Sequence, residues 1–298
     1  MTTCGNRTMS IAAVLALCLP VAAPMPAAAA DAPVTARAIV DRIKDRVGVP
    51  WQEQTVDTFK AGDPATHVTG IAVTMMATLD VLQRAAASGR NLVITHEPTF
   101  FDHRDPTDAL EAEHDPVLAA KLAFIRDHHL VIWRLHDHWH RRAPDGIEVG
   151  VLRALGWQSF QQKDTPWLLT LPETTVAALA ADIRDKLHAP TLRVVGDRAL
   201  KVSRVALLPG AAGFETHRHA LQRNDVEVLV IGEAREWETV EYVADAGAAR
   251  QHKALVIVGH IPSEQAGMEE CTRWLRTFVS EVPVDFVPAA DPFWQPGH

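Results

Sequence analysis

Short apolar runs that alternate with helix-like segments are the feature that most constrains this sequence. The runs are rich in β-branched residues, and the segments between them place apolar side chains at helical spacing. Strands that alternate with helices are typical of an α/β fold, in which helices pack against sheets. We therefore expect an α/β architecture. Four of its predicted strands are Leu92–Thr95, Leu130–Leu135, Val226–Ile231 and Ala254–Val258.

The amphipathic segments are predicted helices, and several other apolar runs are predicted strands. The predicted helices are Ala36–Val47, Leu79–Ala87, Val117–His129, Ile147–Leu155, Thr175–Leu187 with Thr174 as its cap, Glu236–Ala246 and Met268–Phe278. The further strands are Val56–Gly62, His67–Met75, Val202–Leu208 and Val282–Val287. Pro209–Gly213 is predicted to be a turn, and the tail after Pro288 is predicted to be irregular.

Residues 1–30 have the three-part plan of a secretory signal peptide. A basic residue, Arg7, precedes the apolar stretch Ile11–Ala23, and small residues precede Asp31. The apolar stretch is too short for a comfortable transmembrane span, although an uncleaved anchor is the alternative. We expect a mature protein that begins near Asp31, is periplasmic or secreted, and has no membrane association after cleavage.

The charge and the cysteines limit how residues 31–298 are stabilised and what they bind. The formal net charge of the full chain is −8, which argues against nucleic acid as the main partner. Two of the three cysteines lie in the predicted signal peptide, so Cys271 alone leaves no intrachain disulfide. An exported chain without disulfides must be held by its core, a metal or partner subunits.

Residues that can bind metal follow each of the four strands. The clusters are His96-Glu97, His136-Asp137-His138-Trp139-His140, Gly232-Glu233 and Gly259-His260-Ile261-Pro262-Ser263-Glu264. Ligands in open α/β sheets collect at the carboxyl ends of strands, so these clusters can converge on one cleft. The alternative for each cluster taken alone is a polar surface loop.

The residue types in these clusters indicate metal ions. Imidazole and carboxylate together suit zinc, iron or manganese. The donors exceed what one ion needs, so a pair of divalent ions sharing a bridging carboxylate is predicted, and such pairs activate water for hydrolysis. Trp133 and Trp139 are predicted to pack in the core. The other histidines are predicted to be solvated or in loops: His67, His103, His114, His128, His129, His188, His217, His219, His252 and His298.

Five segments, in order, resemble the Nif-three-like family, whose members are also described as GTP cyclohydrolase I type 2 homologues. They are NLVITHEPTFF, RLHDHWH followed by DGIEVGVLRALGW, VSRVALLPGAAG, DVEVLVIGEAREWETVEYVADAG and VIVGHIPSE. The resemblance spans nearly all of residues 31–298. It implies a two-lobed α/β fold, with lobes of approximately 31–160 and 161–298, and a dinuclear metal site in the central cleft. It also implies a homo-oligomer, often a hexameric ring.

Several ligands carry over from the resemblance, and two positions depart from the family pattern. His96, His136, His260 and Glu264 match family ligand positions. Glu97 stands where the family has a second histidine, and His140 stands where it has an aspartate. The family's typical five ligands are three histidines and two carboxylates, and the set His96, Glu97, His140, His260 and Glu264 keeps that total. We therefore interpret the departures as a compensating exchange around one ion. Asp137 and His138 either orient ligands from outside the site or point away from it.

Two functions fit these observations. The first is a metal-dependent hydrolase acting on an unknown small molecule, with Glu264 or Glu233 handling the proton. The second is a metal-binding or scaffolding ring protein without turnover. An exported protein does not meet the cytoplasmic nucleotide pool, so GTP is not the expected natural substrate.

Overall fold

The computed structural model describes residues 1–5 and 33–296, so most of the predicted signal peptide lies outside the described residues. Pro33–His298 forms one compact unit. It is a mixed α/β fold with two sheets and flanking helices, which confirms the predicted fold class. Within the described ranges, no helix has both the length and the apolar character needed to span a membrane.

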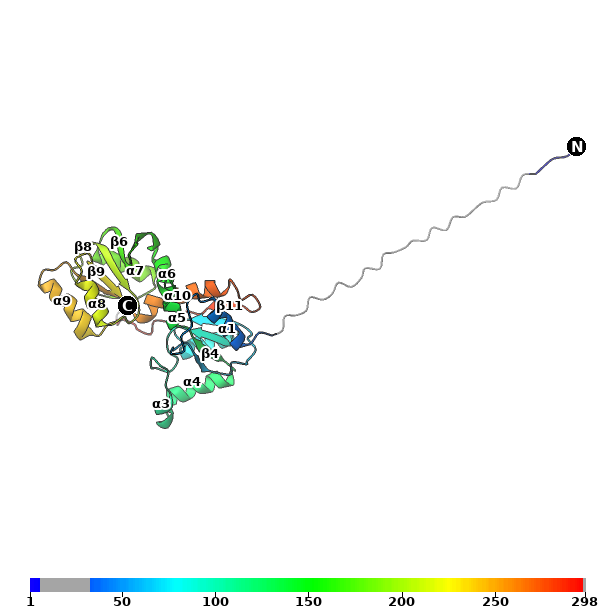
Figure 1. The fold of residues 1–298 in the computed structure, drawn as a ribbon, viewed down its shortest axis with the longest axis horizontal. Coiled ribbons are helices and arrows are strands. Elements are labelled where there is room, and N and C mark those ends of the chain that lie inside the picture. The colour runs from blue at the N-terminus through cyan, green and yellow to red at the C-terminus, as the bar shows by residue number, and fades with distance from the viewer. Residues whose placement is uncertain (6–32, 297–298) are drawn as a thin grey trace. The chain divides into compact units, whose positions relative to one another are not determined.

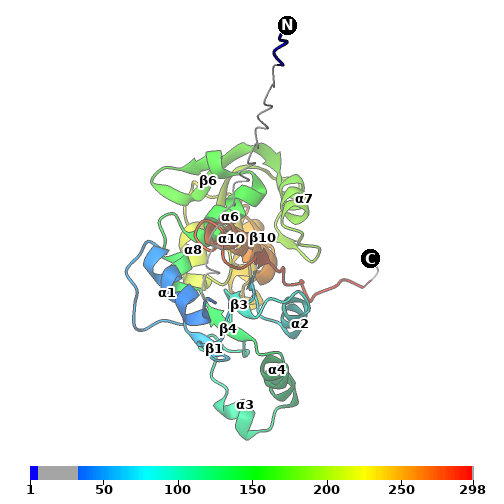
Figure 2. The same ribbon diagram turned by 90° about the vertical axis from the view of Figure 1, so that its right-hand side faces the viewer.

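The first sheet has the strand order β1-β4-β3-β2-β11. These strands are β1 (Phe59–Ala61), β2 (Ile71–Thr74), β3 (Leu92–Thr95), β4 (Val131–Arg134) and β11 (Val284–Phe286). Neighbouring strands are parallel, except that β1 is antiparallel to β4. Every residue of β2, β3 and β4 is buried, which explains why their sequences are almost continuously apolar. The helices of this part are α1 (Ala36–Arg46), α2 (Leu79–Ala87), α3 (Asp108–Ala112) and α4 (Pro116–Asp127) (Figure 2).

The second sheet has the strand order β5-β6-β8-β9-β10-β7. These strands are β5 (Gln161–Gln162), β6 (Thr165–Thr175), β7 (Arg193–Val195), β8 (Lys201–Leu208), β9 (Val228–Ile231) and β10 (Ala254–Ile257). The parallel strands β8, β9 and β10 end at the same edge, where three loops meet. The helices of this part are α7 (Val176–Lys186), α8 (Phe214–Leu221), the π-helix η2 (Glu236–Val240) and α9 (Glu241–Ala248).

Two helices, α6 (Gly146–Leu155) and α10 (His260–Leu275), lie between the two sheets (Figures 1 and 2). They approach closely at glycines. A Cβ on Gly150 would lie 2.2 Å from the carbonyl oxygen of Ala266 and 2.5 Å from the Cα of Gly267. One hydrophobic core continues from the first sheet through both helices into the second sheet. The position of α10, which carries two predicted ligands, therefore depends on this contact.

Two segments near the predicted ligands differ from the sequence-based expectation. α10 begins at His260, although the pattern predicted a helix only from Met268. Pro262 lies in the first turn, where its missing N–H would have no helical partner, so the helix tolerates it. Residues Asp137–His140 form a short helix, α5, which the sequence did not predict. Helical spacing therefore decides which side chains of both segments share a face.

Other predicted boundaries differ less from those in the structure, and some elements were not predicted. Thr175, and not Thr174, caps α7 by accepting a hydrogen bond from the backbone N–H of Ala178. The long strand β6 contains Pro166 and Pro172, residues that normally argue against a strand. The predicted helix Glu236–Ala246 is divided into η2 and α9. The elements α3, α8, β5 and β7 were also not predicted.

Candidate metal centre

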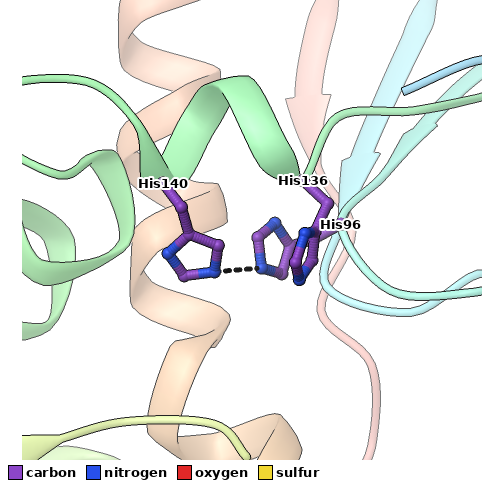
Figure 3. Close-up of side chains that lie close together, drawn as sticks. All are labelled: His96, His136 and His140. Atoms are coloured by element: carbon purple, nitrogen blue, oxygen red, sulfur yellow. Dashed lines mark hydrogen bonds between the residues drawn. The ribbon is translucent and has the colours of Figure 1, made fainter. Parts of the chain in front are cut away.

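Three histidines converge beyond the carboxyl ends of β3 and β4 (Figure 3). His96 follows β3, whereas His136 caps α5 and His140 ends it. A spacing of four residues brings His136 and His140 to the same face of this helical turn. The Nε2 atoms of His96 and His140 are 3.2 Å apart. These three imidazoles form one of two groups in the described chain whose donor atoms could hold a metal ion.

Each of these imidazoles is oriented through its other nitrogen. The three contacts are His96 Nδ1 with the carbonyl oxygen of Leu135 at 3.1 Å, His136 Nδ1 with Asp137 Oδ1 at 2.9 Å, and His140 Nδ1 with Asp145 Oδ2 at 2.9 Å. The partner in each contact is an oxygen that accepts, so Nδ1 carries the proton. Nε2 is then left with its lone pair toward the cluster, which is the arrangement of metal-binding histidines.

Glu264 lies at the centre of the cluster, one turn after the start of α10. Its Oε1 is 3.8 Å from His140 Nε2, and its Oε2 is 3.7 Å from His96 Nε2. His260, one turn earlier on the same helix, places its Nε2 3.3 Å from Glu264 Oε2. Glu97 completes the cluster with Oε1 at 3.3 Å from His260 Nε2 and 3.6 Å from His136 Nε2.

The positions of these donor atoms suit metal binding better than hydrogen bonding to one another. Glu264 Oε2 is buried and makes no hydrogen bond to any residue that the structure describes. A buried oxygen without a hydrogen bond is costly, and a cation would satisfy it. Ligands around a tetrahedral zinc ion are roughly 3.3 Å apart, because zinc–ligand bonds are about 2.0 Å. Several of the separations above are close to this value.

The charges around the cluster also favour binding of a cation. Burial alone would lower the pKa of His260, but three carboxylates outweigh it and raise that pKa to about 12. These carboxylates belong to Glu233, Glu264 and Glu97. Burial alone would raise the pKa of Glu97, but His260 and the neighbouring imidazoles hold it well below its usual range. Burial lowers the pKa of His96, as do His140 and His136, so this imidazole stays neutral and can bind a metal.

Two buried side chains hold the predicted ligands in position through hydrogen bonds. Arg134 donates from Nε to the carbonyl oxygen of His96 at 2.9 Å and from Nη2 to Glu97 Oε2 at 3.2 Å, so Glu97 Oε1 is left facing the cluster. Asp57 holds α5 from a distant part of the chain. Its Oδ1 accepts from the backbone N–H groups of His136 and Asp137, at 2.6 and 3.0 Å.

The other oxygen of Asp57 serves His138. Oδ2 accepts from the backbone N–H of His138 at 2.9 Å and from its Nδ1 at 2.7 Å. Asp57 therefore caps the short helix in place of His136, whose own side chain makes no capping hydrogen bond. Asp137 Oδ2 in turn accepts from Thr55 Oγ1 at 2.8 Å and from the backbone N–H of Val56 at 3.1 Å. Asp137 and His138 thus anchor α5, and His138 points away from the cluster.

Replacing Asp57 by asparagine is expected to weaken metal affinity roughly 10- to 100-fold, the usual cost of losing a group that orients ligands. The amide nitrogen would face the two donors of His138. The short helix α5 could then not hold His136 and His140 in their positions at the cluster. Metal affinity is measured by competition with a chromogenic chelator. Asp63→Asn is the control, because this exposed carboxylate accepts only from the nearby N–H of Ala65. Equal affinities for the two variants would contradict the role of Asp57.

A glycine-rich loop closes the other side of Glu264. Gly210 has φ of +69°, and a Cβ there would lie 2.3 Å from Glu264 Oε1. Its backbone N–H donates to Ser263 Oγ at 3.0 Å, which ties the loop to α10. Glu233 follows β9 at the same edge, and its Oε2 is 3.4 Å from His260 Nδ1. Gly210 therefore gives Glu264 the space that a side chain would fill.

The structure brings together all the side chains predicted to bind metal, and Glu233 stands at their margin. Glu97 and His140 fall in different groups of candidate ligands, and His96 belongs to both groups. The exchange of Glu97 and His140 around one ion stays a prediction. His217 is fully buried, so its prediction as a solvated residue is wrong. Trp133 and Trp139 are buried in the core as predicted. His298 lies outside the described residues.

Comparisons with known proteins agree in sequence and in fold. The sequence profile described as Duf34/NIF3 (NGG1p interacting factor 3) matches residues 35–292. A protein of Clostridium acetobutylicum named GTP cyclohydrolase 1 type 2 homolog is 22% identical over 68% of this chain and 75% of its own. A protein of the same name from Chlamydia pneumoniae is 23% identical over 82% of this chain and 93% of its own.

Solved structures of low sequence identity share the fold. A hypothetical protein of Staphylococcus aureus superposes with a TM-score of 0.68 at 18% identity, covering 89% of this chain and 100% of its own. A Bacillus cereus protein related to NIF3 superposes with a TM-score of 0.68 at 14% identity, covering 88% of this chain and 99% of its own.

Proposed function

This chain belongs to the Duf34/NIF3 family, and we propose that it is a hydrolase that depends on two divalent metal ions. The observation that carries the proposal is the position of Glu264. Its two oxygens face different donors, and one of them is buried without a hydrogen bond to any described residue. A carboxylate in that position is suited to bridge two ions.

The distances suggest how the ligands divide. His96, His140 and Glu264 would hold one ion, since their donor atoms lie between 3.2 and 3.8 Å apart. The second would be held by Glu264 together with His260 and Glu97, with His136 beside Glu97. Zinc, iron and manganese all accept such mixed nitrogen and oxygen ligands. When bound, a pair of such ions activates water and stabilises the charge that develops during hydrolysis.

Glu233 is the residue best placed to move a proton. It is more exposed than the proposed ligands, and His260 lowers its pKa, so its carboxylate is ionised near neutral pH. Its Oε2 can accept a proton from a reacting water at the open side of the cluster. Glu264 is almost fully buried between the donors, so it serves better as a shared ligand than as a proton carrier.

The test is metal analysis of the purified protein, followed by assays of phosphoester, nucleotide and amide hydrolysis with and without a chelator. GTP belongs in the nucleotide set because of the name of the curated relatives. We expect turnover that a chelator abolishes and that added metal restores. Two bound ions without turnover on any of these substrates would instead indicate a metal-binding protein that does not catalyse hydrolysis.

A further inference from the structure

A cavity of about 1150 Å³ lies beside the candidate metal centre, and His260 and Glu233 form part of its wall. It occupies the edge where β8, β9 and β10 end. The loops after these strands contribute Ala211, Ala234 and Gly259 to its lining. A molecule of substrate size that binds here has access to the donors of the metal centre.

An unpaired polar group lies in the wall of this cavity. His217, on α8, is 0% exposed and lines the cavity, and its Nδ1 is 2.9 Å from Thr239 Oγ1. Its Nε2 has no hydrogen-bond partner among the residues that the structure describes. Leaving such a group unsatisfied is unfavourable, so a partner supplied by a bound molecule would relieve it. Thr239 belongs to η2, and π-helical turns occur often at functional sites.

Two aromatic side chains of the C-terminal tail line the same cavity. Phe293 and Trp294 are 70% and 78% exposed, so neither is part of the core. The tail is anchored just before them, because Asp291 Oδ2 accepts a hydrogen bond from Thr191 Oγ1 at 2.6 Å. Asp291 Oδ1 also accepts from the backbone N–H of Phe293 at 3.1 Å. An anchored, exposed aromatic pair offers flat apolar faces on which a planar ring can stack.

The charges in the lining argue against an anionic ligand. Both guanidinium groups that line the cavity already have carboxylate partners. Arg193 Nη1 is 2.6 Å from Glu236 Oε1, and Arg235 Nη1 is 3.2 Å from Glu238 Oε1. The described lining also contains the carboxylates of Glu233 and Asp291. Phosphate groups would thus meet negative charge without an available guanidinium.

We infer that this cavity binds an uncharged planar ring of the substrate, with the ring stacked on Trp294 and its polar edge hydrogen-bonded to His217. The ring's substituent then extends toward His260, where the bond to be hydrolysed lies. Only this last step depends on the proposed hydrolase function. The ring subsite itself rests on the cavity, the unpaired imidazole nitrogen and the exposed aromatic pair.

The experiment is calorimetric titration of the metal-loaded and the chelator-treated protein with adenosine, guanosine and nicotinamide, and with GTP as the charged counterpart of guanosine. At least one uncharged ring is expected to bind with a millimolar or lower Kd in both forms. Trp294→Ala and His217→Phe should each weaken that binding about tenfold, the scale of one lost stacking or hydrogen-bonding contact. Trp237→Ala and His219→Ala are the matched controls, since both side chains are exposed and neither lines the cavity.

The outcomes separate this inference from the proposed function. Ring binding that Trp294→Ala weakens and Trp237→Ala does not would support the subsite, whether or not hydrolysis is found. Failure of all three rings to bind, or equal effects of the two tryptophan variants, would overturn it even if chelator-sensitive hydrolysis were present. Tighter binding of GTP than of guanosine to the chelator-treated protein would also overturn it, because the lining itself would then favour anions. Trp294 is exposed, so this test does not depend on the folding of the His217 variant.

Discussion

Glu264→Gln is expected to lower metal affinity by more than about 100-fold, beyond the loss typical for a group that only orients ligands. Glutamine keeps the shape of the side chain but removes its charge and one of its two acceptor oxygens. The amide N–H₂ group would face the imidazole Nε2 atoms in place of an oxygen that can bind metal. The loss of affinity should therefore extend to both ions. Metal content is measured by mass spectrometry after dialysis, and affinity is measured by chelator competition.

Glu269→Gln is the matched control for this variant. Glu269 lies on the same helix, is exposed and pairs only with nearby Arg273. It should keep the metal content and melting temperature of the parent protein. If Glu264→Gln also kept two ions at parental affinity, Glu264 would not be a shared ligand, and the proposed division of the donors would be wrong.

Gly150→Ala is expected to destabilise the protein by about 3 kcal/mol, the upper range for forcing an extra group into a packed core. The added Cβ would lie 2.2 Å from the backbone oxygen of Ala266, and a backbone atom cannot move away as a side-chain end can. For a chain of this size the loss corresponds to a Tm lower by roughly 10 °C. Thermal unfolding followed by circular dichroism measures the change.

Gly247→Ala gives the opposite expectation in the same assay. Gly247 lies in α9, and a Cβ there would meet nothing within 4 Å. Alanine is favoured over glycine in a helix by up to about 1 kcal/mol, so this variant should be as stable as the parent or more so. Equal melting of the two variants would show that α6 and α10 do not depend on their close contact.

Much of the fold was predictable where local sequence and burial agree. The strand Leu92–Thr95 and the helix Leu79–Ala87 have the predicted bounds, because one is a short run of mostly apolar residues that is fully buried and the other begins after a capping threonine. The ligand clusters were predictable because they directly follow such strands. The start of α10 was missed because Gly259, Pro262 and Gly267 interrupt the helical pattern of the sequence.

The groups that support the ligands were not predictable in the same way. Asp57 lies in the predicted strand Val56–Gly62, where nothing in the sequence marks its carboxylate as a partner of α5. Its role exists only because the fold places it against α5. Arg134 is one polar residue in an apolar strand and could have been suspected for that reason. The buried state of His217 depends on the packing of α8 against η2, which no local pattern encodes.

The pairing of β11 with β2 has a consequence for biosynthesis. Ile71 of β2 pairs with Val284 of β11, so an edge of the first sheet stays open until synthesis has passed β11. A nascent chain lacks α10 for nearly as long and therefore lacks His260 and Glu264. Such distant pairing slows folding and leaves a strand edge exposed to other chains. The order of synthesis thus prevents a half-made chain from assembling the complete cluster around an ion.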